Sequence, residues 1–175
     1  MKFVYNEEKN EAMRHLLIMQ PTVEEAKAKL DKDDTDAAAW YEYGTALSLV
    51  GKALLEKDET DAYAWYVYGK ALSLQKDYEG AIEAHSRGIV YDPFYAPNYF
   101  GRGRRQNAMR RTWPALADYT VAIHLDSDNW TYWYYRATSL NMNGHLEESI
   151  DDFRECMRLS NPAEHYPLIH WIYTT

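Results

Sequence analysis

Large and small residues recur along the chain at a spacing of 34 positions. Shifting the sequence by this amount superimposes an aromatic position, two small positions, a second aromatic position, a third small position and a turn position. The aligned sets are Trp65, Tyr99 and Trp133; Gly69, Gly103 and Ala137; Ala81, Ala115 and Ser149; His85, Tyr119 and Phe153; Gly88, Ala122 and Cys156; and Pro93, Ser127 and Asn161. Small residues let two antiparallel helices approach closely, and aromatic residues fill the space between successive hairpins. The pattern therefore predicts a repeat protein built from helical hairpins.

Helix boundaries follow from the same pattern and from capping residues. Asp61 and Asn129 stand where an N-cap is expected, and Asn161 precedes a proline at the first helical position. Gly144 separates the two helices of the last full unit. We expect helices at residues 6–19, 22–31, 37–50, 62–75, 78–91, 96–109, 114–125, 130–142, 146–159 and 163–174.

The first unit is shorter than the others. Residues 27–49 are repeated, with most residues identical, at 52–74, so that Trp40 and Trp65 are only 25 positions apart. This unit lacks about nine residues of its second helix, and only residues 52–57 remain for it. An isolated helix of less than two turns does not sustain itself.

The sequence is consistent with two structures for this shortened unit. Either a stub helix follows a turn at Gly51, or one helix runs on from 37 to 57 and the hairpin opens. The open form would expose an apolar face and favour domain swapping with a second copy. We expect the stub, because glycine is a poor residue for the middle of a helix.

The signature residues resemble a known family. The segment Trp65-Tyr66-Val67-Tyr68-Gly69, followed by Ala81, Gly88 and Asp92-Pro93, is similar to the tetratricopeptide repeat, with apolar exchanges at Tyr68 and Leu72. The resemblance covers roughly residues 37–161. It implies an all-α fold in which tetratricopeptide-type helical hairpins stack into a right-handed superhelix, an α-solenoid.

The expected organisation is a single domain over residues 1–175. Its parts are N-terminal helices at 1–36, a shortened repeat at 37–61, full repeats at 62–95, 96–129 and 130–162, and a capping or partial-repeat helix at 163–175.

The composition limits the classes of partner and the cellular location that we expect. A net charge of −8 argues against nucleic acid as the partner, because phosphate binding requires a basic surface. The only cysteine, Cys156, excludes an internal disulfide and suits a reducing compartment. Neither a signal peptide nor a membrane span is visible, so we expect a cytoplasmic protein that does not bind membranes. Sixteen Tyr and six Trp exceed what a small core needs, which favours an aromatic binding surface.

Catalytic and metal-binding motifs are missing from the sequence. The histidines form no H-E-x-x-H pair, and the acidic run from Asp31 to Asp36 lacks the glycine and distal glutamate of a calcium loop. His85 and Cys156 fall on repeat core positions, where packing explains them. We expect no enzyme activity, no cofactor and no metal site.

The family resemblance implies a binding groove. In this family the first helix of each unit lines the concave face that holds ligands. By position, the expected groove residues are Tyr41, Tyr66, Lys70, Phe100, Arg104, Asn107, Tyr134 and Asn141. Rings would pack on a ligand's side chains, asparagines would bond its backbone, and the cations would meet a carboxylate. Alternatively, the tyrosines pack between neighbouring helices.

We therefore expect a protein- or peptide-binding scaffold whose ligand is acidic or aromatic-rich. One subclass of the family grips chaperone tails with lysines, and here aromatic residues stand where its first lysine is needed, so that subclass is not favoured. The alternative function is self-assembly into a homo-oligomer through the irregular first repeat or the apolar C-terminal helix, which contains Leu168 and Trp171.

Overall fold

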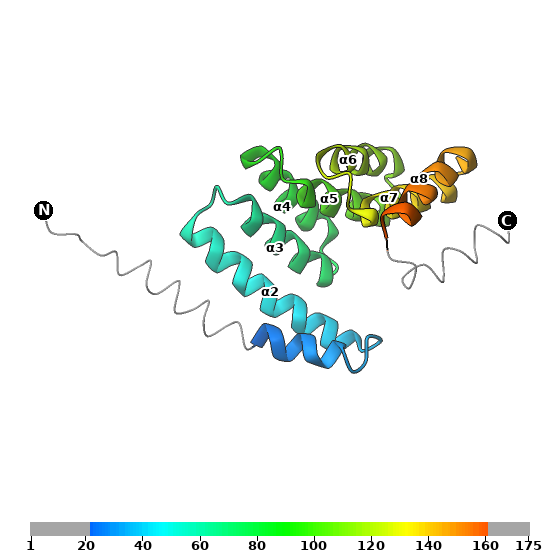
Figure 1. Ribbon diagram of the computed structural model, residues 1–175. Helices are drawn as coiled ribbons and strands as arrows, with labels where there is room; N and C mark the ends of the chain where they lie inside the picture. The colour runs from blue at the N-terminus through cyan, green and yellow to red at the C-terminus, as the bar shows by residue number, and fades with distance from the viewer. Residues whose placement is uncertain (1–21, 161–175) are drawn as a thin grey trace, which may run out of the picture. The chain divides into compact units, whose positions relative to one another are not determined.

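The computed structural model describes residues 22–160, and this part of the chain consists of helices joined by short turns (Figure 1). A helical segment at 22–30 comes first. It is followed by α2 (Ala37–Lys57), α3 (Ala62–Leu74), α4 (Tyr78–Tyr91), α5 (Ala96–Ala108), α6 (Thr112–Leu125), α7 (Trp130–Met142) and α8 (Leu146–Leu159). The chain divides into two compact units, Met1–Gly101 and Arg102–Thr175, which are described separately below.

Apart from α2, these bounds agree with the sequence-based helices to within two residues. The all-α class and the helical hairpins are confirmed. The helices expected at 6–19 and 163–174 lie outside the described residues.

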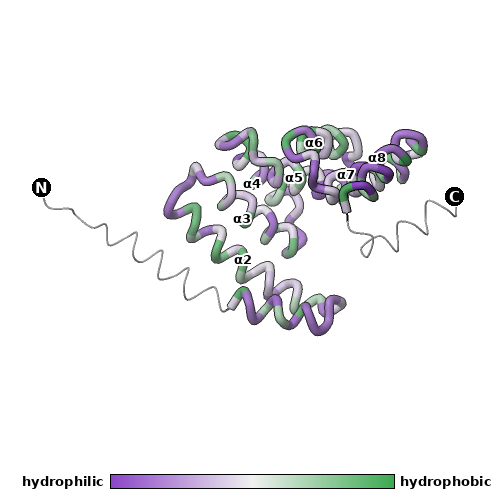
Figure 2. Tube along the Cα trace, in the orientation of Figure 1, coloured by the Kyte–Doolittle hydropathy of each residue, from purple (hydrophilic) through white to green (hydrophobic). Residues whose placement is uncertain are grey.

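Acidic and amide side chains start several of the helices. The Asp36 carboxylate accepts hydrogen bonds from the backbone N–H groups of Ala38 and Ala39, at 2.8 and 3.2 Å. Asp61 and Asn129 accept from the N–H groups two residues further on, which confirms both expected N-caps. The acidic turns before α2 and α3 form hydrophilic bends in Figure 2. Their aspartates therefore serve turn formation and capping.

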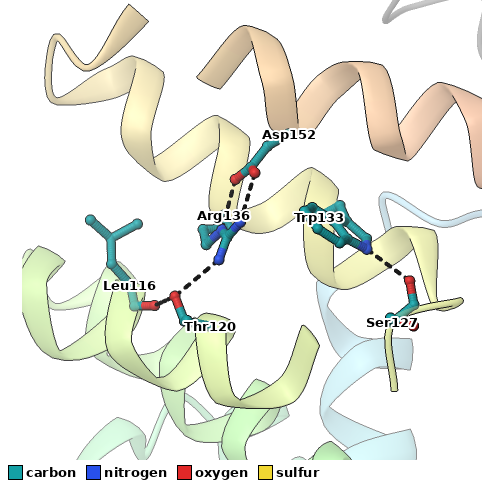
Figure 3. A network of polar contacts seen from close by, with 6 residues as sticks. All are labelled: Leu116, Thr120, Ser127, Trp133, Arg136 and Asp152. Atoms are coloured by element: carbon teal, nitrogen blue, oxygen red, sulfur yellow. Dashed lines mark hydrogen bonds and ion pairs between the residues drawn. The ribbon is translucent and has the colours of Figure 1, made fainter. Parts of the chain in front are cut away.

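The signature tryptophans tie three of the first helices, α2, α3 and α7, to the turns before them. The indole Nε1–H groups of Trp40, Trp65 and Trp133 each donate to the backbone carbonyl six residues earlier, at 2.7 to 2.9 Å. Figure 3 shows this bond between Trp133 and Ser127. Each indole thus satisfies a carbonyl in the preceding turn.

A left-handed residue reverses the chain inside each full hairpin. Lys76, Arg110 and Gly144 have φ angles of 64°, 59° and 84°. These three residues are 34 positions apart in turn, so the same turn is built three times. Gly144 separates α7 from α8 as predicted.

The expected stub in the first unit is wrong, because α2 runs unbroken from Ala37 to Lys57. Gly51 occupies the place that Lys76 has in the next unit, yet it is helical and buried. A Cβ atom there would lie 2.9 Å from the backbone N, Cα and Cβ of Tyr68. Glycine is needed at this position so that α3 can approach α2 closely, and not to form a turn.

A neighbouring helix explains why the shortened hairpin need not close. In the full units the signature glycine faces the aromatic residue of its own second helix: Gly69 faces His85, and Gly103 faces Tyr119. In the shortened unit Gly44 faces Leu74 and Ala71, at the end of α3. The end of α3 therefore covers the surface that the missing second helix would have covered.

The core of the first unit contains a buried polar network. The side chain of His85 is almost fully buried, which confirms its predicted core position. Its Nδ1 lies 3.0 Å from the side-chain oxygen of Asn98, whose Nδ2–H donates to the carbonyl of Ala62. Both polar side chains are thus satisfied inside the unit, as burial requires.

In the second unit, a core cluster forms around Ala137, Phe153 and Cys156. Trp130, Trp133 and Tyr134 pack against it. Cys156 is fully buried, and burial raises the pKa of its thiol, which suits a packing role.

Candidate protein-binding surface

In the first unit, one face of α3 presents two tyrosines and a lysine. Tyr63, Tyr66 and Lys70 follow a three-then-four spacing, so their side chains share a helix face. The Tyr63 side chain is 52% exposed, and its ring centroid lies 6.5 Å from that of Tyr66. The Lys70 ammonium lies 5.8 Å from the centroid of the Tyr43 ring on α2, within reach of a cation–π interaction.

Tyr66 also contributes to packing. Its ring centroid is 6.0 Å from that of His85 on α4 and 6.1 Å from that of Tyr95, which precedes α5. The residue is half-buried. Tyr66 therefore combines the two roles considered from the sequence, since it packs against neighbouring elements and remains partly accessible.

Burial, together with the neighbouring Tyr66 and Tyr63 phenols, raises the pKa of Tyr95 to about 12. The Tyr95 hydroxyl consequently stays neutral over the physiological range and can donate a hydrogen bond. The tyrosines of this face offer apolar rings with neutral polar ends, a combination common at interfaces.

The remaining predicted residues of the first unit lie on α2 and α5. Tyr41 is 61% exposed on α2. Phe100 is half-buried on α5.

In the second unit, α5 contacts α7 through two predicted residues. The Arg104 guanidinium lies 4.8 Å from the centroid of the Tyr135 ring. The Ser139 hydroxyl donates to the side-chain oxygen of Asn107 at 3.0 Å. Both interactions are local and leave Arg104 and Asn107 half-buried at one face of the helix pair.

Tyr134 lies deeper than a groove residue would need to. Its ring centroid is 6.2 Å from that of Phe153 and 5.5 Å from that of Tyr135, and it packs on the core cluster. Asn141, the second-last residue of α7, is half-buried.

Sequence reasoning missed several residues on these faces. Tyr63 precedes Tyr66 by three positions, a spacing that could have revealed it. Tyr95 lies in a turn, and Tyr135 and Ser139 contact α5 from another helix. Only the tertiary structure brings these three residues next to the predicted ones.

Two buried ion pairs recur at the repeat spacing. Arg102 binds the Asp118 carboxylate with two hydrogen bonds of 2.7 and 2.8 Å, and Arg136 binds Asp152 with two of 2.7 Å. Figure 3 shows Arg136 on α7 between Asp152 on α8 and Thr120 on α6. These guanidinium groups stabilise helix packing.

Residues 22–160 contain no cluster of three or more His, Cys, Asp or Glu side chains arranged to hold a metal ion. Across the same residues, every helix is too short or too polar to cross a bilayer.

Comparison with known proteins gives structural likenesses only. No protein-family model matches the sequence, and no curated protein matches it. Among solved structures, the second TPR of Spaghetti (RPAP3) bound to an HSP90 peptide is 27% identical, with a TM-score of 0.57, over 59% of this chain and 96% of that one. MamA from Desulfovibrio magneticus RS-1 is 18% identical, with a TM-score of 0.61, over 91% of this chain and 96% of that one. A chain of the CopN–Scc3 complex is 22% identical, with a TM-score of 0.54, over 63% of this chain and 64% of that one.

The MamA and CopN–Scc3 likenesses concern the fold. The RPAP3 structure is a TPR, and its likeness covers 59% of this chain at 27% identity. The chain has the helical-hairpin fold of tetratricopeptide-repeat proteins.

Proposed function

We propose that this protein is a non-catalytic scaffold that binds a protein or peptide on the faces of the first helices of its repeats. The observation that carries the proposal is the partly exposed row of Tyr63, Tyr66 and Lys70 on α3. Similar structures support the class of ligand, because both TPRs of Spaghetti (RPAP3) were solved with the HSP90 peptide SRMEEVD.

The proposed contact residues are those expected from the sequence. In the first unit they are Tyr41, Tyr66, Lys70 and Phe100, and in the second Arg104, Asn107, Tyr134 and Asn141. A cation beside aromatic rings on a chain of net charge −8 selects for a carboxylate, which favours an acidic or aromatic-rich ligand. Tyr134 contributes through packing as well as contact.

The decisive test uses two lysines with matched surroundings. Lys70 and Lys52 are both exposed, and each ammonium lies over a tyrosine ring, at 5.8 and 5.9 Å. The rings belong to Tyr43 and Tyr68, and Tyr68 lies on the opposite side of α3 from Lys70. Lys70→Glu therefore reverses a charge on the proposed surface, whereas Lys52→Glu makes the same change elsewhere.

The experiment is affinity capture with mass spectrometry from cells that make the protein, comparing wild type with each variant. We expect Lys70→Glu to lose the captured protein and Lys52→Glu to retain it. Retention by both variants would refute the assigned surface. Tyr41→Ala provides a second probe, because its exposed ring can be removed without disturbing the core, unlike that of Tyr66.

The SRMEEVD peptide tests one ligand class directly. Tyr41 and Tyr66 stand where lysines are needed by the subclass that grips chaperone tails, so we expect no saturable binding in a calorimetric titration. Saturable binding that Lys70→Glu removes would place the protein in that subclass after all.

A second candidate function is self-assembly. It is favoured by the unbroken α2, which leaves Trp40, Tyr41 and Leu49 exposed. Sedimentation velocity over a range of concentrations would reveal a reversible dimer, and Leu49→Lys should weaken it. A monomer at high concentration would eliminate this candidate.

A further inference from the structure

The second unit contains a cleft of about 590 Å³ between α6, α7 and α8. Residues that line it include Trp113 and Leu116 from α6, Arg136 and Leu140 from α7, and Glu148 and Asp151 from α8. This volume is within the usual range for sites that hold small molecules or side chains.

The two walls of the cleft differ in chemistry. On α6, the Trp113 indole is 68% exposed, an unusual position for so large an apolar group. On α8, the side chains of Glu148 and Asp151 are 67% and 77% exposed. An aromatic wall therefore faces the same space as an acidic wall.

The positive charge inside the cleft is already neutralised. Arg136 makes two hydrogen bonds to Asp152 and a third to the Thr120 hydroxyl (Figure 3). Among the described residues, the ion-pair partners of Glu148 and Asp151 are on α8 or just before it: His145 at 3.4 Å from Glu148, and Arg154 at 2.9 Å from Asp151. Such exposed pairs contribute little and can be exchanged for a better partner. The cleft thus has excess negative charge.

This cleft lies on a different side of α7 from the proposed groove residues. At about 100° of rotation per residue, Tyr134 and Asn141 are roughly 140–160° around the helix from Arg136. A ligand in the cleft would leave the Tyr134 side of the helix free.

The first unit contains an equivalent cleft. This smaller cleft has a volume of about 290 Å³. Five of its lining residues stand 68 positions before lining residues of the cleft in the second unit: Tyr68, Leu72, Gly80, Glu83 and Ala84. In this cleft of the first unit, the positive charge comes from a side chain of the protein itself.

That cation is Arg87. Its guanidinium lies 5.4 Å from the Trp65 ring centroid and 3.1 Å from the Glu83 carboxylate. At the position equivalent to Arg87, the second unit has Glu155.

The ring equivalent to that of Trp65 belongs to Trp133, and Arg136 already lies 5.2 Å from its centroid. The aromatic group that remains exposed in the second cleft is therefore Trp113.

We propose that the cleft of the second unit binds an arginine side chain from a partner protein. A planar guanidinium can stack on the Trp113 indole while its N–H groups donate to the Asp151 or Glu148 carboxylate. Lysine lacks the planar surface for this arrangement. The site is distinct from the groove of the proposed function and does not depend on it.

Nuclear magnetic resonance tests the site with a defined probe. The ¹⁵N-labelled protein is titrated with the capped tripeptide Ala-Arg-Ala, and with capped Ala-Glu-Ala as the comparison. The indole signal of Trp113 is identified by its loss in Trp113→Phe. We expect a saturable shift of this signal with Ala-Arg-Ala only, weakened by added salt because the carboxylates are exposed.

Matched variants locate the binding. Replacing both cleft carboxylates, as Glu148→Gln with Asp151→Asn, should raise the Kd by about threefold or more. Glu83→Gln makes the same kind of change in the first unit and should leave the Trp113 titration unaltered. The proposal is overturned if Ala-Glu-Ala gives an equal shift, if the double variant binds as wild type does, or if no saturable shift occurs.

Discussion

Each full hairpin reverses direction at a residue in the left-handed conformation, which is Lys76, Arg110 or Gly144. Of these three, only the glycine adopts that conformation without strain. In each turn the residue's N–H donates to the carbonyl three positions back, and the next N–H donates to the carbonyl five positions back. This pair of backbone hydrogen bonds ends the first helix with a residue in the left-handed conformation. A side chain in that conformation costs about 1–2 kcal/mol.

Glycine substitution should reveal this strain. We expect Lys76→Gly and Arg110→Gly each to raise the free energy of unfolding by about 0.5–1 kcal/mol, because relief of strain outweighs the added freedom of the unfolded chain. Gly144→Ala should lower it by about 1 kcal/mol, since nothing else crowds that position. Urea denaturation measures all three. A loss of stability in either glycine variant would contradict the strain argument.

The sequence alone predicted the structural roles of some of these single residues and not those of others. Gly144 was readable as a turn residue and His85 as a core residue. Lys76 and Arg110 were not readable, because their left-handed conformation comes from the bonds of the turn and not from their own preference. Asn98 was missed because its value lies in bonding His85 and Ala62, and both contacts are tertiary.

Pairs of helices in the second unit are joined by bidentate ion pairs. Arg102 connects α5 to Asp118 on α6, and Arg136 connects α7 to Asp152 on α8. Both aspartate side chains are only 7% exposed, so each depends on its arginine for the hydrogen bonds that water would otherwise supply.

Removing one partner should therefore cost more than removing both. Arg136→Ala leaves the Asp152 carboxylate buried without its partner, and we expect a loss of about 3 kcal/mol in the free energy of unfolding. The double variant Arg136→Met with Asp152→Leu should lose much less, because no charge is stranded. Guanidinium denaturation distinguishes these cases. Equal losses would show that the pair itself, and not the stranded charge, determines stability.

The continuous α2 is the element that the sequence did not predict. Gly51 lies at the turn position of its unit, and glycine disfavours a helix interior, so local rules pointed to a break. Packing reversed that preference, because Tyr68 of α3 occupies the space beside Gly51 and the end of α3 covers Gly44. Intrinsic propensity is a weak guide where tertiary contacts are this close.

Amide hydrogen exchange tests the continuity of α2. In an unbroken helix the N–H groups of residues 48–55 all donate to carbonyls four positions back, so we expect uniform protection across them. A gap of fast exchange at 51–53 would indicate a turn followed by a stub. The measurement is hydrogen exchange followed by nuclear magnetic resonance.

Across the whole molecule, each unit buries a tyrosine whose ionisation opposes folding. Burial raises the pKa of Tyr95 in the first unit to about 12, and burial raises the pKa of Tyr119 in the second unit even more. In the unfolded chain both phenols ionise near pH 10. The unfolded state therefore binds fewer protons than the folded state above that pH, and stability must fall as pH rises.

We expect the free energy of unfolding to be independent of these tyrosines below about pH 9 and to decline from about pH 10 to 12. Tyr119→Phe removes one ionising group and should flatten part of the decline. Urea denaturation at several pH values gives the measurement. An unchanged slope in Tyr119→Phe would show that other groups cause the decline.

The fold of the whole chain was more predictable than its binding surface. Over residues 62–159, the 34-residue register predicted the order of the helices and their grouping into hairpins, because small and aromatic residues at fixed positions dictate hairpin packing. The same register placed Tyr66 and Tyr134 in one row. Tyr66 is partly accessible beside Tyr63, whereas Tyr134 packs on Phe153, a difference that depends on neighbouring side chains and not on position in the repeat.

The unbroken helix α2 has a consequence for how the first unit unfolds. Repeat arrays usually open one unit at a time, because each unit meets its neighbours only across an interface. A single helix of 21 residues, about 31 Å long, here takes the place of both helices of the shortened repeat, and α3 packs closely against it at Gly44 and Gly51. The shortened repeat therefore has no hairpin of its own that could stay folded once α3 comes away. Under mechanical load or partial denaturation, α2 and α3 should melt as a single cooperative block.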